Sequence, residues 1–505
     1  MESPLVLQAK PGVKRDGTRN EGDFYVDCQW MRFNNLGRPQ KMGGYTQISQ
    51  LASGLIYGCH VFCDSSIAYI HTGHANGLEV QYSTFGGVYS AGPFNRTPAA
   101  FPASANNIWV FDSIFDSSGG GRPRVLAHAA QNLADIDSNV TSKLYYGDIT
   151  ATGALTDTGA PELSGGVCVL HPYTFVYGSD GRVGWSNAGT PATWPAGNTA
   201  RITASKIVYG APIRGGAGQA PAGLFWSLDS LVRATFIGGS ATFNFDTITS
   251  ESSVLSSRGI VEMDGIYYWI GAERFLMFNG VVREIPNALN NDWFFENLNQ
   301  AQRQKVWATK IPRWGEIWWF YPRGTATECT HAVVYNTRLQ TWYDTELPEG
   351  GRTDGYYARV ARNPIWCGTQ ANALGKYILW SHESYGSYNK VAGGQASAIQ
   401  SYFVTPDLNY NTSGKINNMR ITRLELDLNQ VGDMTASRLG RRYPRSPLTE
   451  EGATVFSDTT EVVDGIRGQS RYLYLKFESN TANGFYEMGD TLVWIAPGDI
   501  RPAPA

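Results

Sequence analysis

Four residues that raise the question of a zinc site lie within sixteen residues of one another in the segment GCHVFCDSSIAYIHTGHA. They are Cys59, Cys63, His71 and His74. A structural zinc site needs four donor atoms within about 2.0–2.3 Å of one ion. The run from Cys59 to Cys63 is β-forming and has no glycine, so these two residues lie about 13 Å apart along a strand. The sequence therefore predicts ordinary strand and turn residues here, and no metal.

A second group that could do chemistry is a run of four arginines in RLGRRYPR. They are Arg438, Arg441, Arg442 and Arg445. Guanidinium groups in such a cluster bind phosphate backbones or acidic protein surfaces. We expect the run to form a loop between two strands. It is either simply solvated or a contact with a neighbouring subunit or with DNA.

Candidate catalytic groups are sparse. Glu425 and Asp427 alternate on one predicted strand, about 6–7 Å apart, a separation that suits glycoside hydrolysis. On a solvated sheet face we expect no role for them. The seven histidines accompany no nucleophile elbow. The sequence therefore predicts a non-enzymatic protein with no catalytic, cofactor-binding or metal-binding residues.

Composition favours sheets joined by tight turns. Of 505 residues, 17% are charged and 13% aromatic, and 56 are glycine. Aromatic side chains suit a pleated surface, and glycine suits turns. The net charge of −3 does not indicate a general nucleic-acid binder. The six scattered cysteines predict reduced, mostly buried thiols.

The sequence also gives expectations about location. Its first residues show no secretory signal, and no apolar run approaches the roughly 20 residues needed to span a membrane. We therefore predict synthesis in the cytoplasm and no membrane span.

A strand–turn–strand pattern recurs over 51–395. It is clearest at 167–187, 260–285 and 305–324, and units follow one another every 35–60 residues or so, a spacing typical of propellers and solenoids. Asp264-Gly265 predicts a two-residue hairpin turn. We predict a β-propeller of about six or seven blades over 51–395.

The predicted propeller contains one helical insertion, at about 287–308. This segment lacks glycine and proline, and its apolar residues form one stripe at helical spacing. The stripe consists of Trp293, Phe294, Leu298 and Ala301.

The two flanking regions have different patterns. Residues 1–50 are predicted to form an extended arm, with one strand at 24–33. Residues 396–505 are predicted to form a separate β-sandwich, because 419–429 and 471–479 alternate between apolar and polar residues. Such alternation is typical of a strand with one buried and one wet face.

The stretch PGVKRDGTRNEGDFYVDCQWMRFNNLGRPQKMGGY (11–45) resembles the opening of virion structural proteins of short-tailed bacteriophages. The shared features are PG-x-x-RDGT, QW-x-RF and GRP-x-K-x-GGY. Further similar stretches extend the resemblance over roughly 11–345. They lie at 176–194, 224–239, 253–271 and 276–286.

The resemblance implies a tail hub or nozzle subunit of a podovirus, located in the virion tail. Such proteins form a ring, usually a homohexamer, below the portal and adaptor, and tail fibres or tailspikes adjoin it. The ring extends the tail tube, retains the packaged genome and conducts double-stranded DNA at ejection. The implied role is non-enzymatic.

Two other functions stay open. The turn SDGRVGW at 179–185 resembles a degraded Asp-box of sialidase propellers, so one alternative is a glycan-binding or sialidase-like tail protein that contacts the host surface. A cellular WD- or kelch-like scaffold is the weaker alternative, because the signatures of those repeats are missing.

Overall fold

The protein is nearly all β, as the sequence predicts. The computed structural model describes residues 2–18, 22–51, 53–65, 67–84, 89–118, 121–213, 220–239, 241–358, 363–383, 389–392, 395–408, 418–464, 466 and 468–498. Within these ranges the chain forms many short strands, one α-helix and two 3-10 helices.

Six antiparallel sheets are each built from four strands that follow one another along the chain. The first three sheets are β8 (Ile56–Asp64), β9 (Ile67–His74), β10 (Gly77–Thr84) and β11 (Tyr89–Asn95); β12 (Asn107–Asp116), β13 (Arg122–Asn132), β14 (Leu144–Asp148) and β15 (Thr156–Asp157); and β16 (Gly166–Leu170), β17 (Tyr173–Tyr177), β18 (Arg182–Trp185) and β19 (Thr199–Arg201). The next three are β20 (Ile207–Pro212), β21 (Ala222–Ser227), β22 (Leu231–Phe236) and β23 (Phe243–Thr249); β24 (Val261–Met263), β25 (Ile266–Ile270), β26 (Phe275–Phe278) and β27 (Val282–Glu284); and β28 (Trp307–Ile311), β29 (Glu316–Tyr321), β30 (His331–Asn336) and β31 (Thr341–Glu346).

A seventh sheet combines strands from distant parts of the sequence. Its order is β32 (Arg352–Tyr356), β33 (Ile365–Ala371), β34 (Tyr377–His382), β7 (Tyr45–Leu51), β35 (Asn389–Ala392) and β36 (Gln395–Ala398). β7 pairs antiparallel with β34, with Tyr45 opposite His382. An early strand therefore completes a sheet whose other strands come more than 300 residues later.

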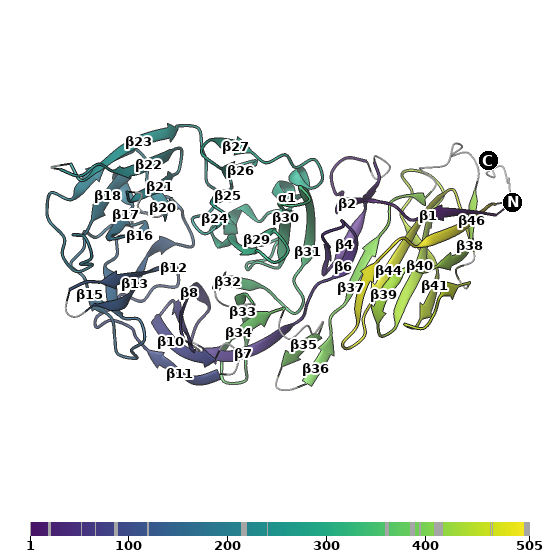
Figure 1. Cartoon of the computed structure of the whole chain (residues 1–505), viewed down its shortest axis with the longest axis horizontal. Helices are drawn as coiled ribbons and strands as arrows, with labels where there is room; N and C mark the ends of the chain where they lie inside the picture. Colours follow the sequence, from purple (N-terminus) through teal and green to yellow (C-terminus); the bar gives the residue numbers. More distant parts are fainter. Residues whose placement is uncertain are drawn as a thin grey trace.

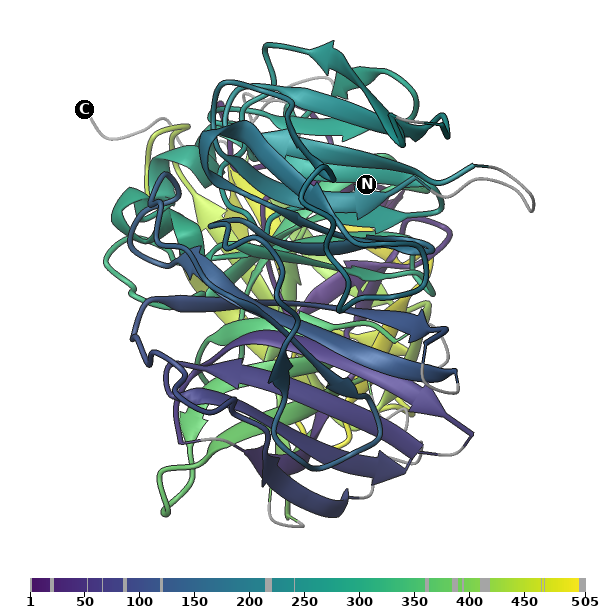
Figure 2. The same ribbon diagram turned by 90° about the vertical axis from the view of Figure 1, so that its left-hand side faces the viewer.

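These seven sheets, hereafter the seven-sheet assembly, surround a common centre (Figure 1). The first strands of successive sheets contact one another from β32 through β8, β12 and β16 to β20, and from β24 through β28 back to β32. Figure 2 shows the sheets as separate layers. Neighbouring layers interlock through large aromatic side chains; the rings of Trp226 and Trp269 lie 5.8 Å apart, edge to face. Such pairs add about 0.5–1.5 kcal/mol to the gain from burial alone.

The predicted hairpin at Asp264-Gly265 is confirmed. Met263 pairs with Ile266, and the two turn residues have φ angles of 54° and 82°. Positive φ at both central positions is the type I′ geometry that matches strand twist, and glycine adopts it without steric cost.

The remaining strands form three further sheets, hereafter the C-terminal assembly. One contains β1 (Ser3–Val6), β46 (Leu492–Pro497), β38 (Met419–Glu425), β42 (Val462–Val463) and β43 (Gly468–Ser470); the second contains β4 (Asp27–Gln29), β37 (Ser401–Val404), β44 (Tyr472–Ser479), β40 (Met434–Arg441) and β41 (Thr449–Phe456); the third contains β39 (Leu428–Val431), β45 (Phe485–Met488), β6 (Pro39–Lys41) and β5 (Met31–Phe33). A short parallel pair, β2 (Lys10–Val13) with β3 (Phe24–Tyr25), lies beside β31. Figure 1 shows the purple strands running from this assembly into β7.

The first fifty residues are therefore woven into both assemblies. β1, β4, β5 and β6 pair within the C-terminal assembly, and β7 pairs within the seven-sheet assembly. The prediction of one strand over 24–33 is wrong. This stretch forms three short strands with three different partners, because Trp30 has a φ of 47° and turns the chain out of extended geometry.

The helical segment predicted at about 287–308 is present, but it is shorter than predicted and divided in two. The chain forms α1 (Asn291–Asn297) and then the 3-10 helix η2 (Gln300–Lys305). Leu298 between them is extended, with ψ of 129°. The side chain of Asn299 then accepts a hydrogen bond from the N–H of Ala301, which starts a new helix. The predicted apolar stripe is broken at this point.

The alternating segments of the C-terminal assembly depart from prediction in two ways. The expected strand 419–429 is interrupted after Glu425, and β38 and β39 belong to different sheets. In β44, Leu473, Leu475 and Phe477 are buried as expected. Tyr472 and Tyr474 on the opposite face are buried too, in a second small cluster with Val404 and Leu439, so both faces of this strand are covered.

Candidate functional site: the junction of the two assemblies

The residues of the PG-x-x-RDGT motif tie the N-terminal segment to β31 and α1. The guanidinium of Arg15 lies 2.9 Å from Oδ1 of Asp344 and 2.7 Å from Oδ1 of Asp27. Burial lowers the pKa of Arg15, but the two carboxylates outweigh it and the net pKa is raised, so the group stays charged. Asp16 accepts hydrogen bonds from the N–H groups of Asp292 (2.9 Å) and Trp293 (2.8 Å) at the start of α1. These donors have no partner within a helix.

Gly12 of this motif lies where no side chain fits. Its φ is +123°, and a Cβ atom there would lie 2.4 Å from Oγ1 of Thr341 and 2.5 Å from a methyl group of Leu289. The hydroxyl of Thr341 donates a 2.6 Å hydrogen bond to the carbonyl of Pro11. The side chains of Thr341 and Leu289 pack so closely on this backbone that the position requires glycine.

The QW pair of the second motif binds the end of β31. The amide nitrogen of Gln29 donates to the carbonyl of Glu346 at 2.9 Å, and its amide oxygen accepts from the N–H of Glu346 at 3.1 Å. The N–H of Trp30 donates to Oγ1 of Thr345 at 2.9 Å, and the Trp30 side chain is buried. This segment therefore pairs with β31 through side chains rather than through a sheet ladder.

Arg32 is the centre of a buried charge network between the assemblies. Its Nε lies 3.0 Å from Oε1 of Glu316, and its Nη1 donates to Oε2 of Glu383 at 2.8 Å. The guanidinium also stacks on Trp314, 4.8 Å from the ring centroid. Tyr343 donates a 2.5 Å hydrogen bond to Glu316. Arg32 and Glu316 are 2% and 0% exposed, so this pair is shielded from water.

The two carboxylates of this network have opposite pKa shifts. Burial raises the pKa of Glu316, although Arg32 opposes the shift. Burial also raises that of Glu383, but the charge of Arg32 and hydrogen bonds from Arg32 and Trp314 outweigh it, and the net pKa is lowered. We therefore regard Arg32–Glu383 as the firmly ionised pair. The charged groups of this network are held in place by ion pairs and hydrogen bonds to one another.

One continuous hydrophobic core surrounds this network. It contains residues from the last sheets of the seven-sheet assembly, such as Trp318 and Trp366, together with Phe403, Leu475 and Phe477 of the C-terminal assembly. Fully burying such side chains stabilises the fold by about 1.5–3 kcal/mol each. The two assemblies therefore share one hydrophobic core.

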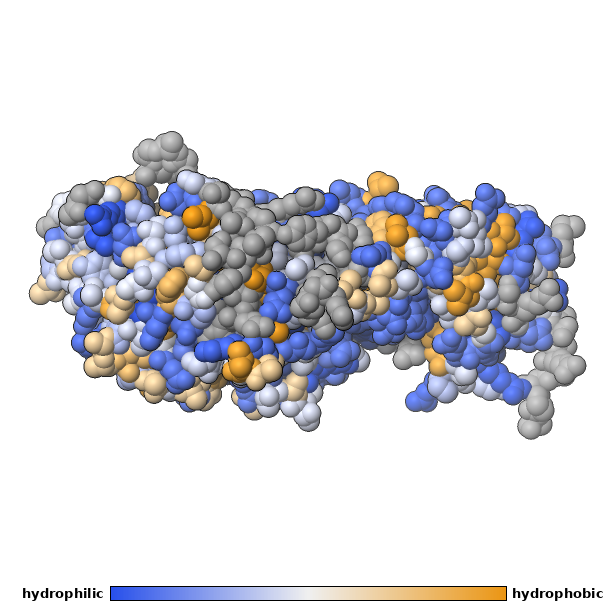
Figure 3. Space-filling model, turned by 90° about the horizontal axis from the view of Figure 1, so that it is seen from below, coloured by the Kyte–Doolittle hydropathy of each residue, from blue (hydrophilic) through white to orange (hydrophobic). Residues whose placement is uncertain are grey.

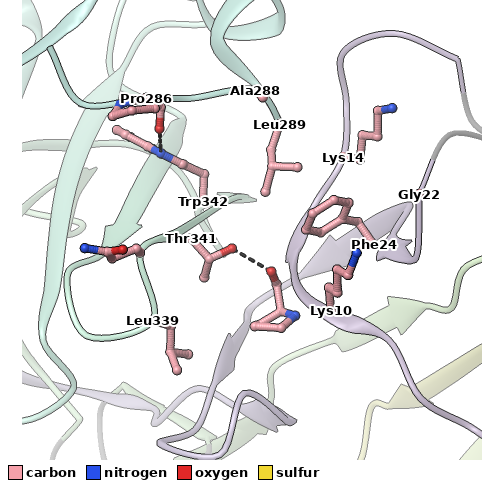
Figure 4. A pocket seen from close by; sticks show the side chains of 12 residues that line it. Lys10, Lys14, Gly22, Phe24, Pro286, Ala288, Leu289, Leu339, Thr341 and Trp342 are labelled. Atoms are coloured by element: carbon pink, nitrogen blue, oxygen red, sulfur yellow. Dashed lines mark hydrogen bonds between the residues drawn. The ribbon is translucent and has the colours of Figure 1, made fainter.

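A surface pocket of about 590 Å³ lies beside the junction (Figure 4). Lys10, Lys14 and Phe24 stand on one side of it, and Leu289 and Trp342 on the other. Lys10 lies 5.8 Å from the ring centroid of Phe24 and 3.9 Å from Asp23. The pocket joins apolar walls with two lysines at one edge.

A second cavity, of about 530 Å³, lies at the centre of the seven-sheet assembly. The first strands of six of the seven sheets contribute to its wall. Its polar and aromatic lining includes His60, Asp112, Tyr209, Glu262, Lys310 and Tyr356. No local sequence motif indicates this group, because each strand contributes only one to four of its residues.

The cysteine and histidine set lies in the hairpin β8–β9. Cys59 is buried, opposite Thr72, on the face that packs against Cys367 and Leu379. The Nε2 atom of His71 lies 3.1 Å from the carbonyl oxygen of Ile149, on the other face. In the described ranges, no three His, Cys, Asp or Glu side chains are placed to hold a metal ion, and all six cysteines are free thiols.

Only part of the arginine cluster lies in the expected loop. Arg438 and Arg441 belong to β40 and are 4% and 5% exposed. Arg438 forms an ion pair with Glu451, and Arg441 donates a 2.6 Å hydrogen bond to the hydroxyl of Tyr474. Arg442 and Arg445 follow the strand and are exposed. The cluster is therefore divided into two structural arginines and two accessible ones.

The carboxylates Glu425 and Asp427 have separate partners. Glu425 lies 3.0 Å from Nη2 of Arg423. Asp427 accepts a 2.8 Å hydrogen bond from the N–H of Asp490, next to the chain turn at Gly489. These bonds fix local backbone geometry.

The surface differs between the two assemblies. Viewed from below, hydrophobic side chains gather on the right-hand part of the molecule, which holds the C-terminal assembly (Figure 3). Among the described residues, the large hydrophobic side chains exposed in this assembly are Val6, Leu36, Val431, Tyr443, Val455 and Val462. Among the helices that the structure describes, none has the length and apolar character to span a membrane.

Comparisons with known proteins give no family. No family model matches the chain, and neither does any curated protein. Three solved structures share a distant likeness. The computationally designed Ika8 protein is 10% identical, with a TM-score of 0.35, over 67% of this chain and 99% of its own. The extracellular domain of a one-component system from B. thetaiotaomicron is 10% identical, with a TM-score of 0.41, over 91% of this chain and 57% of its own. An exo-β-1,3-galactanase from Phanerochaete chrysosporium, solved with galactose, is 9% identical, with a TM-score of 0.26, over 90% of this chain and 100% of its own.

Proposed function

We propose that the seven-sheet assembly is a seven-bladed β-propeller and that the C-terminal assembly is a β-sandwich completed by N-terminal strands. Six consecutive four-stranded antiparallel sheets and a seventh closed by β7 support this architecture. In a propeller, radial repetition leaves only short strand edges at the rim, and a strand from the other end of the chain fastens the last blade to the circle.

We further propose that the protein is a non-enzymatic subunit of the tail nozzle or hub ring of a short-tailed bacteriophage. One observation carries this proposal. The residues that carry the resemblance, Arg15, Asp16, Gln29, Trp30 and Arg32, are the ones that bind the first strands across the junction. Motifs used to make one rigid block suit a subunit that must keep its shape beside pressurised DNA.

Surface properties supply further support. Exposed apolar residues on the C-terminal assembly suit contacts between subunits, since interface cores are depleted in charge. The accessible Arg442 and Arg445 suit a neighbouring acidic surface or a transient phosphate contact. The net charge of −3 suits a channel wall that must not retain DNA.

The test is assembly. The purified chain is examined by light scattering and electron microscopy, alone and with phage portal–adaptor complexes. We expect a closed ring, with six copies as the family role implies, that docks below the adaptor. A chain that stays monomeric and never joins the tail would contradict the proposal.

A matched pair of variants locates the contact. Arg442→Glu combined with Arg445→Glu reverses two exposed charges of the C-terminal assembly. Arg182→Glu combined with Arg201→Glu does the same on β18 and β19, where both side chains are exposed. We expect only the first pair to weaken ring formation.

We do not extend the proposal to a sialidase-like activity. Sialic acid is an anion, and among the described residues that line the central cavity there is one lysine, no arginine and two carboxylates. Such a wall repels a carboxylate.

A further inference from the structure

The central cavity has the size and position of a small-molecule site. Its volume of about 530 Å³ lies within the 300–1,000 Å³ or so that ligand pockets typically have. Its wall comes from the first strands of six sheets. Because these sheets are packed against one another, the lining groups are held in place before any ligand arrives, which lowers the entropic cost of binding.

The charged groups of the wall are fixed by their own partners. The Nζ atom of Lys310 lies 3.1 Å from Oε2 of Glu262 and also donates to the Glu262 carbonyl. The other carboxylate oxygen of Glu262 accepts a 2.8 Å hydrogen bond from the N–H of Gly265. Oδ2 of Asp112 accepts from the N–H of Val169 at 2.7 Å. An ammonium group has three donors, and Lys310 directs two of them to Glu262.

His60 adds a neutral donor and acceptor to the wall. It is 6% exposed, and its Nε2 has no hydrogen-bond partner among the described residues. Burial lowers its pKa to about 4, so the imidazole is uncharged at neutral pH. Its ring lies 5.1 Å from that of Tyr356, edge to face. The wall therefore offers donors and acceptors together.

The charge balance and the aromatic rings narrow the class of ligand. Two carboxylates face one ammonium group, which disfavours anions. Tyr209, Tyr356 and Tyr357 supply flat apolar surfaces beside the polar groups. A pyranose ring matches both properties, because its hydroxyl groups donate and accept while its C–H face packs on aromatic rings.

We propose that the central cavity binds one neutral monosaccharide unit. Lys310, Glu262, Asp112 and His60 contact its hydroxyl groups, and the tyrosines contact its apolar face. This assignment does not depend on the nozzle function, since a ring subunit with or without a bound sugar has the same junction.

The experiment is saturation-transfer-difference NMR on the full chain, followed by titration calorimetry. The probes are D-glucose, D-galactose, D-mannose and N-acetyl-D-glucosamine, with glucose 6-phosphate and spermidine as charged comparators. We expect at least one neutral sugar to bind, more tightly than either comparator. Absence of binding by all four sugars, or tighter binding of a comparator, overturns the proposal.

Variants place the binding site. Lys310→Met removes a hydrogen-bond donor from the binding site and is expected to weaken sugar binding about tenfold or more. The matched control is Lys143→Met. Lys143 forms an exposed ion pair with Asp157 at 2.7 Å and does not line the cavity. This variant should bind the sugar as tightly as the wild type does. Ser113→Tyr fills the cavity from β12 and should abolish binding, with folding checked by circular dichroism. Unchanged affinity in folded Ser113→Tyr overturns the proposed location.

Discussion

Arg32 and Glu316 form a buried ion pair between residues 284 positions apart in the sequence, with 3.0 Å between Nε and Oε1. Arg32 lies in β5 of the C-terminal assembly, and Glu316 begins β29 of the seven-sheet assembly. This contact, like those of Arg15 and Gln29 with β31, links the first strands to the sixth sheet of the assembly that surrounds the cavity.

Arg32→Met should destabilise the protein by about 3–5 kcal/mol, because it leaves Glu316 and Glu383 buried without their cation. Urea unfolding followed by tryptophan fluorescence measures the change. The control is Arg182→Met, which breaks an exposed pair with Asp180 and should cost less than about 1 kcal/mol. Equal losses for the two variants would contradict the assigned role of Arg32.

Gly12→Ala should cost more than Gly280→Ala. Both glycines have a positive φ, +123° and +110°, so both variants suffer similar backbone strain of about 1–2 kcal/mol. A methyl group at Gly280 meets open space, whereas one at Gly12 meets Thr341 and Leu289. Overpacking adds about 1–3 kcal/mol. Thermal unfolding of the two variants side by side measures the difference in stability. A loss of stability in Gly280→Ala alone would contradict the close packing of Thr341 and Leu289 on Gly12.

A fragment of residues 395–498 should not fold alone. Its sheets lack β1, β4 and β6, which pair with β46, β37 and β45, and they also lack β5, which pairs with β6. We expect poor dispersion in its NMR spectrum. Joining residues 2–44 to it through a flexible linker should restore dispersed signals. A fragment that folds cooperatively without the added strands would show that they are dispensable.

Stability should fall as pH decreases from about 6.5 to 4. Burial lowers the pKa of His60, His74, His128 and His331 to about 4 each. In this pH window the unfolded chain binds more protons than the folded chain does. Each histidine therefore contributes stability above pH 6.5, and this contribution is lost as the pH falls through the pKa of the folded state. The free energy of unfolding decreases by at most about 1.4 kcal/mol per pH unit for each histidine. Burial raises the pKa of Asp354 to about 6. The contribution of Asp354 to stability therefore increases as the pH falls, and it offsets the loss from one of the histidines.

Chemical unfolding at a series of pH values measures this slope. His128→Gln removes one titrating group and should flatten the curve relative to the wild type. The same substitution at an exposed position, His171→Gln, is measured beside it for comparison. Stability that does not depend on pH between 6.5 and 4 would refute the assignment.

Local patterns predicted what depends on neighbours in the sequence. The turn at Asp264-Gly265 needs only two residues that accept positive φ, and the burial of Leu473, Leu475 and Phe477 follows from a period of two. The all-β character follows in the same way from short apolar runs separated by turns.

These local patterns do not predict which distant segments pair with one another. The arginine run suggested a loop, but β40 continues through Arg441, and Arg438 meets Glu451 across the neighbouring strand β41. Nothing in the sequence near Arg32 indicates that its partners are Glu316 and Glu383. The central cavity was missed for the same reason, since its wall exists only after six strands meet.

The closing position of β7 has a consequence for biosynthesis. Residues 45–51 leave the ribosome hundreds of residues before β34, and β1 is made even earlier than its neighbour β46. β7 and β1 therefore cannot pair until translation has produced their partner strands β34 and β46. A nascent chain is thus kept from maturing piecemeal, and only a copy that has been synthesised through β46 can present a finished surface to its neighbours.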